Sequence, residues 1–187
     1  MKPNEIQYRR DLYKLFEGVP KGDLGSIVEV GVAEGNFSEE MLNWPVKFPR
    51  VYSVDRWINH DTKGDSGNPQ SWHDANYCRV VDRLAKFEDR SKIVRRNSVE
   101  AASLFGDGEL DLVYIDADHS YEGCKADIEA WFPKVKADGF MAFHDYINPA
   151  YGVNRAVKEF CQARGLAIHT MAEDKPEDAG ALILKKC

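Results

Sequence analysis

The chain has 187 residues, of which 43% are hydrophobic and 30% charged, a balance typical of a globular protein rather than a disordered one. This length fits a single domain, residues 1–187, and the net charge of −6 argues against nonspecific binding to nucleic-acid backbones. No apolar run approaches the ~18 residues of a membrane span, and residues 1–5 contain no signal-peptide core. We therefore expect a cytoplasmic protein that binds neither nucleic acid nor membranes, with its cysteines reduced because none forms a C-x-x-C pair.

Amphipathic stretches and short apolar runs alternate along the chain. The opening segment, residues 1–20, contains a predicted leading helix over 5–16 that ends before Gly18. Apolar stripes at helical spacing predict three more helices, through the groups Tyr77, Val80, Val81, Leu84 and Phe87; Cys124, Ile128 and Trp131; and Val153, Ala156, Val157, Phe160 and Cys161. Runs rich in Val and Ile predict strands over Ser26–Val30, Val51–Val54, Lys92–Arg95, Leu112–Ile115, Phe140–Phe143, Leu166–His169 and Ala181–Leu184.

This alternation predicts an α/β fold with a Rossmann-like, doubly wound sheet of seven mostly parallel strands. The last two strands have only the turn-rich residues 173–178 between them, which predicts a C-terminal antiparallel hairpin. Residues 57–74 interrupt the pattern at the sheet edge where such folds bind ligands. We expect a substrate lid there, with a plain surface loop as the alternative. Its aromatic and histidine side chains are candidates for the acceptor pocket or for simple packing: Trp57, His60, Trp72 and His73.

The first predicted strand runs into a turn that contains Gly31 and Gly35. Glycine after a buried strand permits a tight turn and close approach of a ligand, and the next helix points its amide groups toward that turn. The G-x-x-x-G spacing differs from the G-x-G-x-x-G of dinucleotide sites, and glycines that merely pack helix against strand are the alternative. The second strand ends in Asp55, where a nucleoside site needs an acid for the ribose hydroxyls. Together these features favour an adenosine-containing ligand.

Acidic residues and histidines follow two further strands. Asp116 follows the fourth strand, and His144 and Asp145 follow the fifth. If these strands are parallel neighbours, the three side chains emerge at one edge, where their donor atoms suit Mg²⁺ or Mn²⁺. His119 would lie close by and could accept a substrate proton, because histidine titrates near neutrality. The alternative is that these residues are ordinary strand-end caps, with His144 paired to Asp145.

Three strings in the sequence carry a family resemblance: VEVGVAEGNFS, YSVD and LDLVYIDADHSYEGCKADIEAWFPKVKADGFMAFHDY. They resemble the class I S-adenosylmethionine-dependent methyltransferases, and within these the small-molecule O-methyltransferases of the methyltransferase family 24 type. The chain is similar, more distantly, to catechol and caffeoyl-CoA O-methyltransferases. The resemblance runs from about Ser26 onward and implies S-adenosylmethionine as cofactor, with O-methylation of a small acceptor such as a sugar or natural product.

The resemblance also implies roles for individual residues. Glu29, Gly31 and Gly35 would line the methionine end of the cofactor, Asp55 would hold its ribose and Ser98 would lie near its adenine. The complete set of expected cofactor contacts is Glu29, Gly31, Val32, Glu34, Gly35, Phe37, Asp55, Arg56, Asn97, Ser98, Asp116 and Ala117. The expected metal ligands are Asp116, His144 and Asp145, and the expected catalytic residues are His119 and Asp116.

Two departures from the family pattern stand out. Ala33 replaces the middle glycine of the usual E-x-G-x-G-x-G, and Tyr146 stands where the catechol enzymes have a metal-binding asparagine. The alternatives are therefore an N-methyltransferase or a metal-independent methyltransferase. More distant ones are a non-catalytic nucleoside-binding protein and an NAD-dependent oxidoreductase. The leading helix could serve a homodimer interface or merely cover the sheet.

Overall fold

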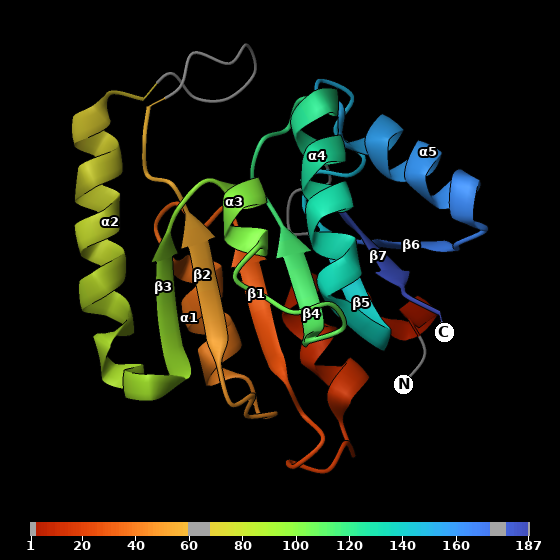
Figure 1. Ribbon diagram of the computed structural model, residues 1–187, viewed down its shortest axis with the longest axis horizontal. Coiled ribbons are helices and arrows are strands. Elements are labelled where there is room, and N and C mark those ends of the chain that lie inside the picture. Colours follow the sequence, from red (N-terminus) through yellow and green to blue (C-terminus); the bar gives the residue numbers. More distant parts are fainter. Residues whose placement is uncertain (1–2, 60–67, 173–178, 187) are drawn as a thin grey trace.

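A seven-stranded sheet forms the centre of the computed structural model, which describes residues 3–59, 68–172 and 179–186 (Figure 1). The strands are β1 (Ser26–Val30), β2 (Val51–Asp55), β3 (Ser91–Arg95), β4 (Leu110–Ile115), β5 (Val135–Phe143), β6 (Ile168–Met171) and β7 (Gly180–Leu184). Their order is β3-β2-β1-β4-β5-β7-β6, with β1 to β5 parallel and β7 antiparallel to both of its neighbours. The predicted doubly wound sheet with a C-terminal antiparallel hairpin is confirmed.

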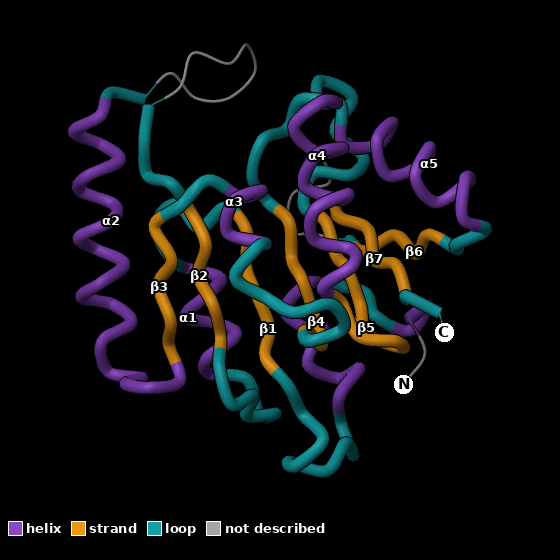
Figure 2. The backbone as a smooth tube through the Cα atoms, viewed as in Figure 1, coloured by secondary structure: helices purple, strands orange, loops and turns teal. Residues whose placement is uncertain are grey.

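Helices cover both faces of the sheet (Figure 2). The α-helices are α1 (Asn36–Asn43), α2 (Gln70–Leu84), α3 (Ser98–Ala102), α4 (Tyr121–Trp131) and α5 (Val153–Arg164). One apolar cluster joins the sheet to α3, α4 and α5, with Trp131 fully buried at its centre. A second cluster joins the opposite face to α1, α2 and the N-terminal segment, with Met41 fully buried. The central strands are thus buried on both faces, which explains their continuous apolar sequences.

The predicted leading helix over 5–16 is wrong in extent and type. The segment forms two short 3-10 helices, η1 (Pro3–Glu5) and η2 (Arg9–Phe16), and the chain between them is extended. Tyr8 forms a parallel bridge with Ala172 just beyond β6, so strand-like pairing interrupts the helical pattern. Leu12 and Leu15 fall on one side of η2 because a 3-10 helix has three residues per turn. The segment covers the sheet, which was one of the two roles considered for it.

Several boundaries also differ from the sequence predictions; strand β5, for example, begins at Val135 instead of Phe140. Helix α2 begins at Gln70, so residues 70–74 of the predicted lid belong to a helix. Of the predicted stripe, Val80 and Leu84 are buried and Tyr77 and Phe87 pack against the same core, whereas Val81 is 39% exposed. Strand β6 begins two residues late because Leu166 still caps α5, donating its amide to the Cys161 carbonyl at 3.0 Å. Residues 60–67 of the predicted lid, including His60, and the turn over 173–178 lie outside the described residues.

Two chain-wide features complete the fold. Over the described ranges, no helix is both long enough and apolar enough to cross a membrane. Cys78, Cys124 and Cys161 are free thiols, and the last two are buried. Two further 3-10 helices, η3 (Ala85–Arg90) and η4 (Phe132–Lys134), directly precede β3 and β5.

The order of the strands reverses between β1 and β4. Strands β2 and β3 lie on one side of β1, and β4 and β5 extend the sheet on the other. In open α/β sheets, ligands bind at the carboxyl ends of the strands where the order reverses. The loops after β1, β2, β4 and β5 therefore define the place to look for a site.

Candidate active site

A cavity of about 660 Å³ opens at the carboxyl ends of β1, β2 and β4. It is lined by all of the expected cofactor contacts except Gly35, namely Glu29, Gly31, Val32, Glu34, Phe37, Asp55, Arg56, Asn97, Ser98, Asp116 and Ala117. His119 also lines it, as do Trp57, Trp72 and His73 from the segment predicted as a lid. Residues far apart in the sequence thus meet around one space large enough for a nucleoside ligand.

The two glycines of the first turn have different structural roles. Gly31 adopts φ +88°, and a Cβ on it would lie 1.8 Å from the carbonyl oxygen of Asp116. The ends of β1 and β4 approach this closely because the Asp116 amide donates to the Val30 carbonyl at 2.7 Å. Gly35 starts α1 with φ +77° and packs toward Val80 instead of lining the cavity. The first glycine therefore fixes the position of Asp116, and the second places a helix.

Asp55 holds the glycine turn in place. Its Oδ2 accepts hydrogen bonds from the amides of Val32 and Ala33 at 2.9 and 3.0 Å, and its Oδ1 accepts from the Trp57 amide at 2.7 Å. A carboxylate accepts about four hydrogen bonds, so room for about one more donor remains. The resemblance implied that Asp55 holds both ribose hydroxyls, whereas this geometry leaves space for one.

Trp57 anchors the same turn from the other side. Its indole N–H donates to the Ala33 carbonyl at 2.9 Å, and its side chain is fully buried. Ala33 and Trp57 both adopt left-handed backbone angles, φ +47° and +45°. Such angles cost a non-glycine residue about 1–2 kcal/mol, and strained residues of this kind cluster at functional sites. Trp57 is thus both a packing group and a wall of the cavity.

Glu29 is an acid buried beneath the glycine turn. It is 3% exposed and accepts a short hydrogen bond from the Ser38 hydroxyl, which lies 2.6 Å from the hydroxyl oxygen of Ser53. Burial raises the pKa of Glu29 to about 8, although the Ser38 hydrogen bond opposes this shift. Glu29 is therefore mostly protonated at neutral pH.

Replacing Glu29 by Gln should make the folded protein less sensitive to pH. Because the folded pKa lies above the ordinary value of 4.5, the stabilising contribution of Glu29 is fully present below about pH 4.5 and is lost as the pH rises through 8. Between pH 5 and 7 the wild type should lose about 2 kcal/mol more than the Gln variant. Urea unfolding at both pH values measures this difference. Exposed Glu100→Gln is the control, and parallel pH profiles for wild type and Glu29→Gln would contradict a neutral Glu29.

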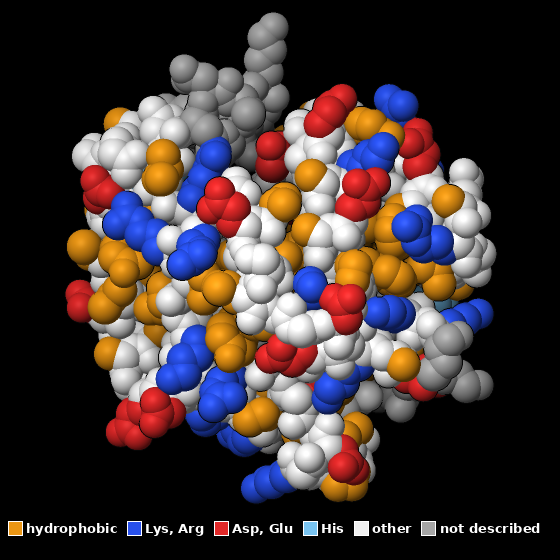
Figure 3. All heavy atoms as spheres, viewed as in Figure 1, with side chains coloured by type: hydrophobic (Ala, Val, Ile, Leu, Met, Phe, Trp, Pro, Cys, Tyr) orange, Lys and Arg blue, Asp and Glu red, His pale blue; other side chains and the backbone are white. Residues whose placement is uncertain are grey.

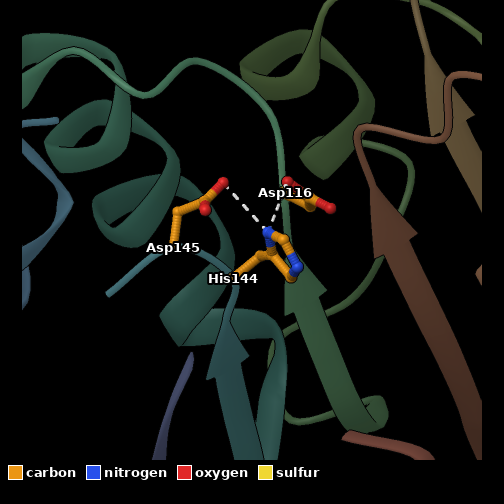
Figure 4. A group of neighbouring side chains, drawn as sticks. All are labelled: Asp116, His144 and Asp145. Atoms are coloured by element: carbon orange, nitrogen blue, oxygen red, sulfur yellow. Dashed lines mark ion pairs between the residues drawn. The ribbon is translucent and has the colours of Figure 1, made fainter. Parts of the chain in front are cut away.

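A cluster of two aspartates and two histidines forms where β4 and β5 end, and Figure 4 shows three of its members, Asp116, His144 and Asp145. His144 Nδ1 lies 2.9 Å from Asp145 Oδ2 and 3.5 Å from Asp116 Oδ1. His119 Nε2 lies 3.1 Å from Asp145 Oδ2 and 3.3 Å from Asp116 Oδ1. The His119 ring stacks on Tyr151, with 4.5 Å between the ring centroids. The structure thus brings together all the predicted metal and catalytic residues at one edge.

Electrostatics couple the members of this cluster. Burial opposes ionisation of Asp145, but its contacts with His119 and His144 outweigh burial and lower its pKa. Burial likewise opposes the charged form of His144, but its contact with Asp145 and the charges of both carboxylates raise its pKa. The contact between His144 and Asp145 therefore favours the charged form of each.

The cluster fits a divalent cation. One donor atom from each of Asp116, His144 and Asp145 lies within 4.8 Å of the others. His144 Nδ1 is buried, and within the described part of the chain neither of its carboxylate contacts has the direction of a hydrogen bond. Two carboxylate oxygens and an imidazole nitrogen form a donor set that accepts Mg²⁺ or Mn²⁺. Asp145 reaches the cluster from a left-handed backbone angle, φ +53°.

Four charged residues of the cavity were missed by the sequence analysis: Arg9, Arg96, Asp118 and Asp127. Arg9 of η2 lines the cavity and lies over the Phe37 ring at 5.0 Å. No sequence signal marks it, because only the fold brings the N-terminal segment to this place. Asp127 of α4 also lines the cavity and is buried. Its signal is visible in hindsight, since it interrupts the apolar helical stripe that runs from Cys124 to Trp131.

Known proteins resemble the chain in sequence and in fold. Residues 28–146 match a family model described as "Methyltransferase domain". An uncharacterized Sinorhizobium fredii protein, y4gI, is 30% identical over 94 residues, which are 50% of this chain but only 10% of that protein. Its activity therefore says little about this chain.

Solved structures show the same fold at low sequence identity. The calicheamicin methyltransferase CalS11 has a TM-score of 0.64 and 20% identity over 92% of this chain and 75% of its own. An O-methyltransferase from Bacillus cereus, solved in complex with S-adenosylhomocysteine, has a TM-score of 0.65 and 12% identity over 95% and 79%. The family model spans well over half of the chain and includes the glycine turn, Asp55 and the whole acidic cluster. The chain therefore belongs to this family of methyltransferase domains.

Proposed function

We propose that this chain is a class I S-adenosylmethionine-dependent methyltransferase and that it methylates a hydroxyl group of a small molecule such as a sugar or natural product. The observation that supports this best is the cluster of Asp116, His119, His144 and Asp145 at the cavity edge, which suits activation of a hydroxyl. Lys and Arg side chains alternate with Asp and Glu on the face shown in Figure 3, a distribution that does not favour a nucleic-acid acceptor. The names of the two structural relatives, a calicheamicin methyltransferase and an O-methyltransferase, agree with the proposal.

Different residues of the cavity have different roles in the proposed reaction. S-adenosylmethionine supplies a methyl group that is already activated, so the protein mainly aligns donor and acceptor. The turn after β1, held by Asp55, shapes the cofactor side of the cavity. His119 forms part of the cavity wall, oriented by the carboxylates of Asp116 and Asp145 and by stacking on Tyr151. From there His119 accepts the proton that the acceptor hydroxyl loses.

A divalent metal belongs to the same proposal, held by Asp116, His144 and Asp145. When bound, Mg²⁺ or Mn²⁺ lowers the pKa of a hydroxyl and fixes its direction. The buried His144 nitrogen, which faces both carboxylates in Figure 4, supports this assignment. Tyr146, where the catechol enzymes have a ligand, is buried in the apolar cluster of α4 and α5, so Asp116, His144 and Asp145 would supply the protein's share of the coordination.

Removing the metal should lower methyl transfer to hydroxylated acceptors by ~10²-fold, since metal activation contributes several kcal/mol. The assay is methyl transfer from labelled S-adenosylmethionine to a panel of sugars and phenols, with EDTA and after readdition of Mg²⁺ or Mn²⁺. Asp145→Asn should reproduce the loss and should also weaken Mn²⁺ binding in calorimetry. Asp82→Asn, an exposed change on α2, is the matched control.

Each outcome of that assay separates two candidate functions. Loss with EDTA and recovery with metal support metal-assisted O-methylation. Full activity in EDTA would remove the metal from the proposal and favour the metal-independent alternative. Activity with amine acceptors but none with hydroxyl acceptors would replace O-methylation by N-methylation.

A further inference from the structure

Asp127 is a buried acid to which the reaction described above assigns no role. Its side chain is 4% exposed and shares one face of α4 with Cys124, Ile128 and Trp131. Burying a carboxylate costs free energy unless hydrogen bonds or charges compensate it. We therefore expect hydrogen-bond donors around the carboxyl group of Asp127.

One donor comes from a short relay of side chains. The Ser98 hydroxyl donates to Asp127 Oδ1, and the Trp131 indole N–H donates to the Ser98 oxygen at 2.9 Å. Because the Ser98 proton is directed at Asp127, the relay fixes the orientation of the carboxyl group. Burial raises the pKa of Asp127 to about 6, with the Ser98 hydrogen bond opposing and the charge of Asp118 adding to the shift. At neutral pH the group is thus mostly ionised and acts only as an acceptor.

The second carboxylate oxygen has no such donor in the described part of the chain. The hydrogen bond from Ser98 uses Oδ1, and Oδ2 accepts none from a described residue. Asp127 nevertheless lines the cavity, next to Asn97 and Ser98 after β3. An ionised acceptor at the wall of a nucleoside-sized cavity can be satisfied by a donor on the ligand.

Adenine offers a suitable donor. It carries an amino group at position 6, whereas hypoxanthine and guanine carry a carbonyl oxygen there, which is an acceptor. We propose that Asp127 accepts a hydrogen bond from the 6-amino group of the cofactor's adenine and so selects adenosyl over inosyl ligands. This inference rests on the proposed function, which puts the cofactor in this cavity.

The selection can be measured with two ligands that differ at one position of the base. Calorimetry gives the dissociation constants of S-adenosylhomocysteine and S-inosylhomocysteine for the wild type and for Asp127→Asn. The wild type should bind the adenosyl ligand about 10–100-fold more tightly, the range expected for a hydrogen bond to a charged group. In Asp127→Asn, Ser98 still donates to the side-chain oxygen, which leaves the amide nitrogen to donate to the inosyl carbonyl. In this variant the ratio of the dissociation constant of S-inosylhomocysteine to that of S-adenosylhomocysteine should therefore fall toward one.

Two further variants serve as controls. Asp111→Asn changes another buried aspartate, paired with Lys136 at 2.6 Å outside the cavity, and should keep the wild-type ratio. Ser98→Ala removes the relay but keeps the carboxylate, so it should reduce the ratio without abolishing it. This variant tests the inference if Asp127→Asn does not fold.

The outcomes distinguish this inference from the proposed function. A wild type that binds both ligands equally, or a folded Asp127→Asn with an unchanged ratio, would overturn the role of Asp127 and leave the methyltransferase assignment intact. A wild type that binds neither ligand would overturn both.

Discussion

Replacing His119 by Ala should lower the rate of methyl transfer by about 10²–10⁴-fold, the range that general-base catalysis contributes. Binding of S-adenosylhomocysteine should stay close to that of the wild type, because the turn held by Asp55 does not depend on His119. Single-turnover kinetics and calorimetry on the same preparation measure the two effects separately.

The matched control for His119 is His169→Ala, since His169 lies on β6 at the far edge of the sheet. It should keep full activity. If His119→Ala retained the wild-type rate with a hydroxyl acceptor, His119 would have no part in proton transfer. If it lost cofactor binding as well, its role would be structural.

Gly31→Ala should have the second large effect, because the new Cβ would meet the Asp116 carbonyl at 1.8 Å. The left-handed φ of +88° adds to this clash. Together they should lower the free energy of unfolding by about 2–5 kcal/mol and displace Asp116 from the site. Urea unfolding gives the stability, and titration with S-adenosylhomocysteine should show much weaker binding.

Gly22→Ala provides the comparison, since a Cβ at Gly22 has no neighbour within 4 Å among the described residues. It should change stability by no more than about 0.5 kcal/mol. Equal stability and equal cofactor affinity in the two variants would contradict the close approach of β1 and β4.

The sheet was predictable because its strands are buried on both faces. Continuous apolar runs such as Phe140–Phe143 leave little choice of structure, and the residues just after the strands must emerge at one edge once the strands are parallel. This is why Asp116, His144 and Asp145 could be placed together from the sequence. The distances among these side chains, and the pKa shifts of His144 and Asp145, could be known only from the folded structure.

The errors fall where tertiary contacts decide the local structure. The leading segment has a helical pattern, but the bridge between Tyr8 and Ala172 draws it into an extended path. Arg9 reaches the cavity for the same reason. Asp127 was overlooked because its neighbours on α4 form an apolar stripe, and the buried hydrogen bond from Ser98 that stabilises it joins two helices.

The most direct test of the whole account is calorimetric titration of the wild-type protein with S-adenosylhomocysteine, and with NAD⁺ as the rival ligand. The account predicts saturable, one-to-one binding of S-adenosylhomocysteine and none of NAD⁺. Binding of NAD⁺ alone would indicate an NAD-dependent oxidoreductase. Binding of neither ligand would mean that the cavity lined by Asp55 and Gly31 is not a cofactor site.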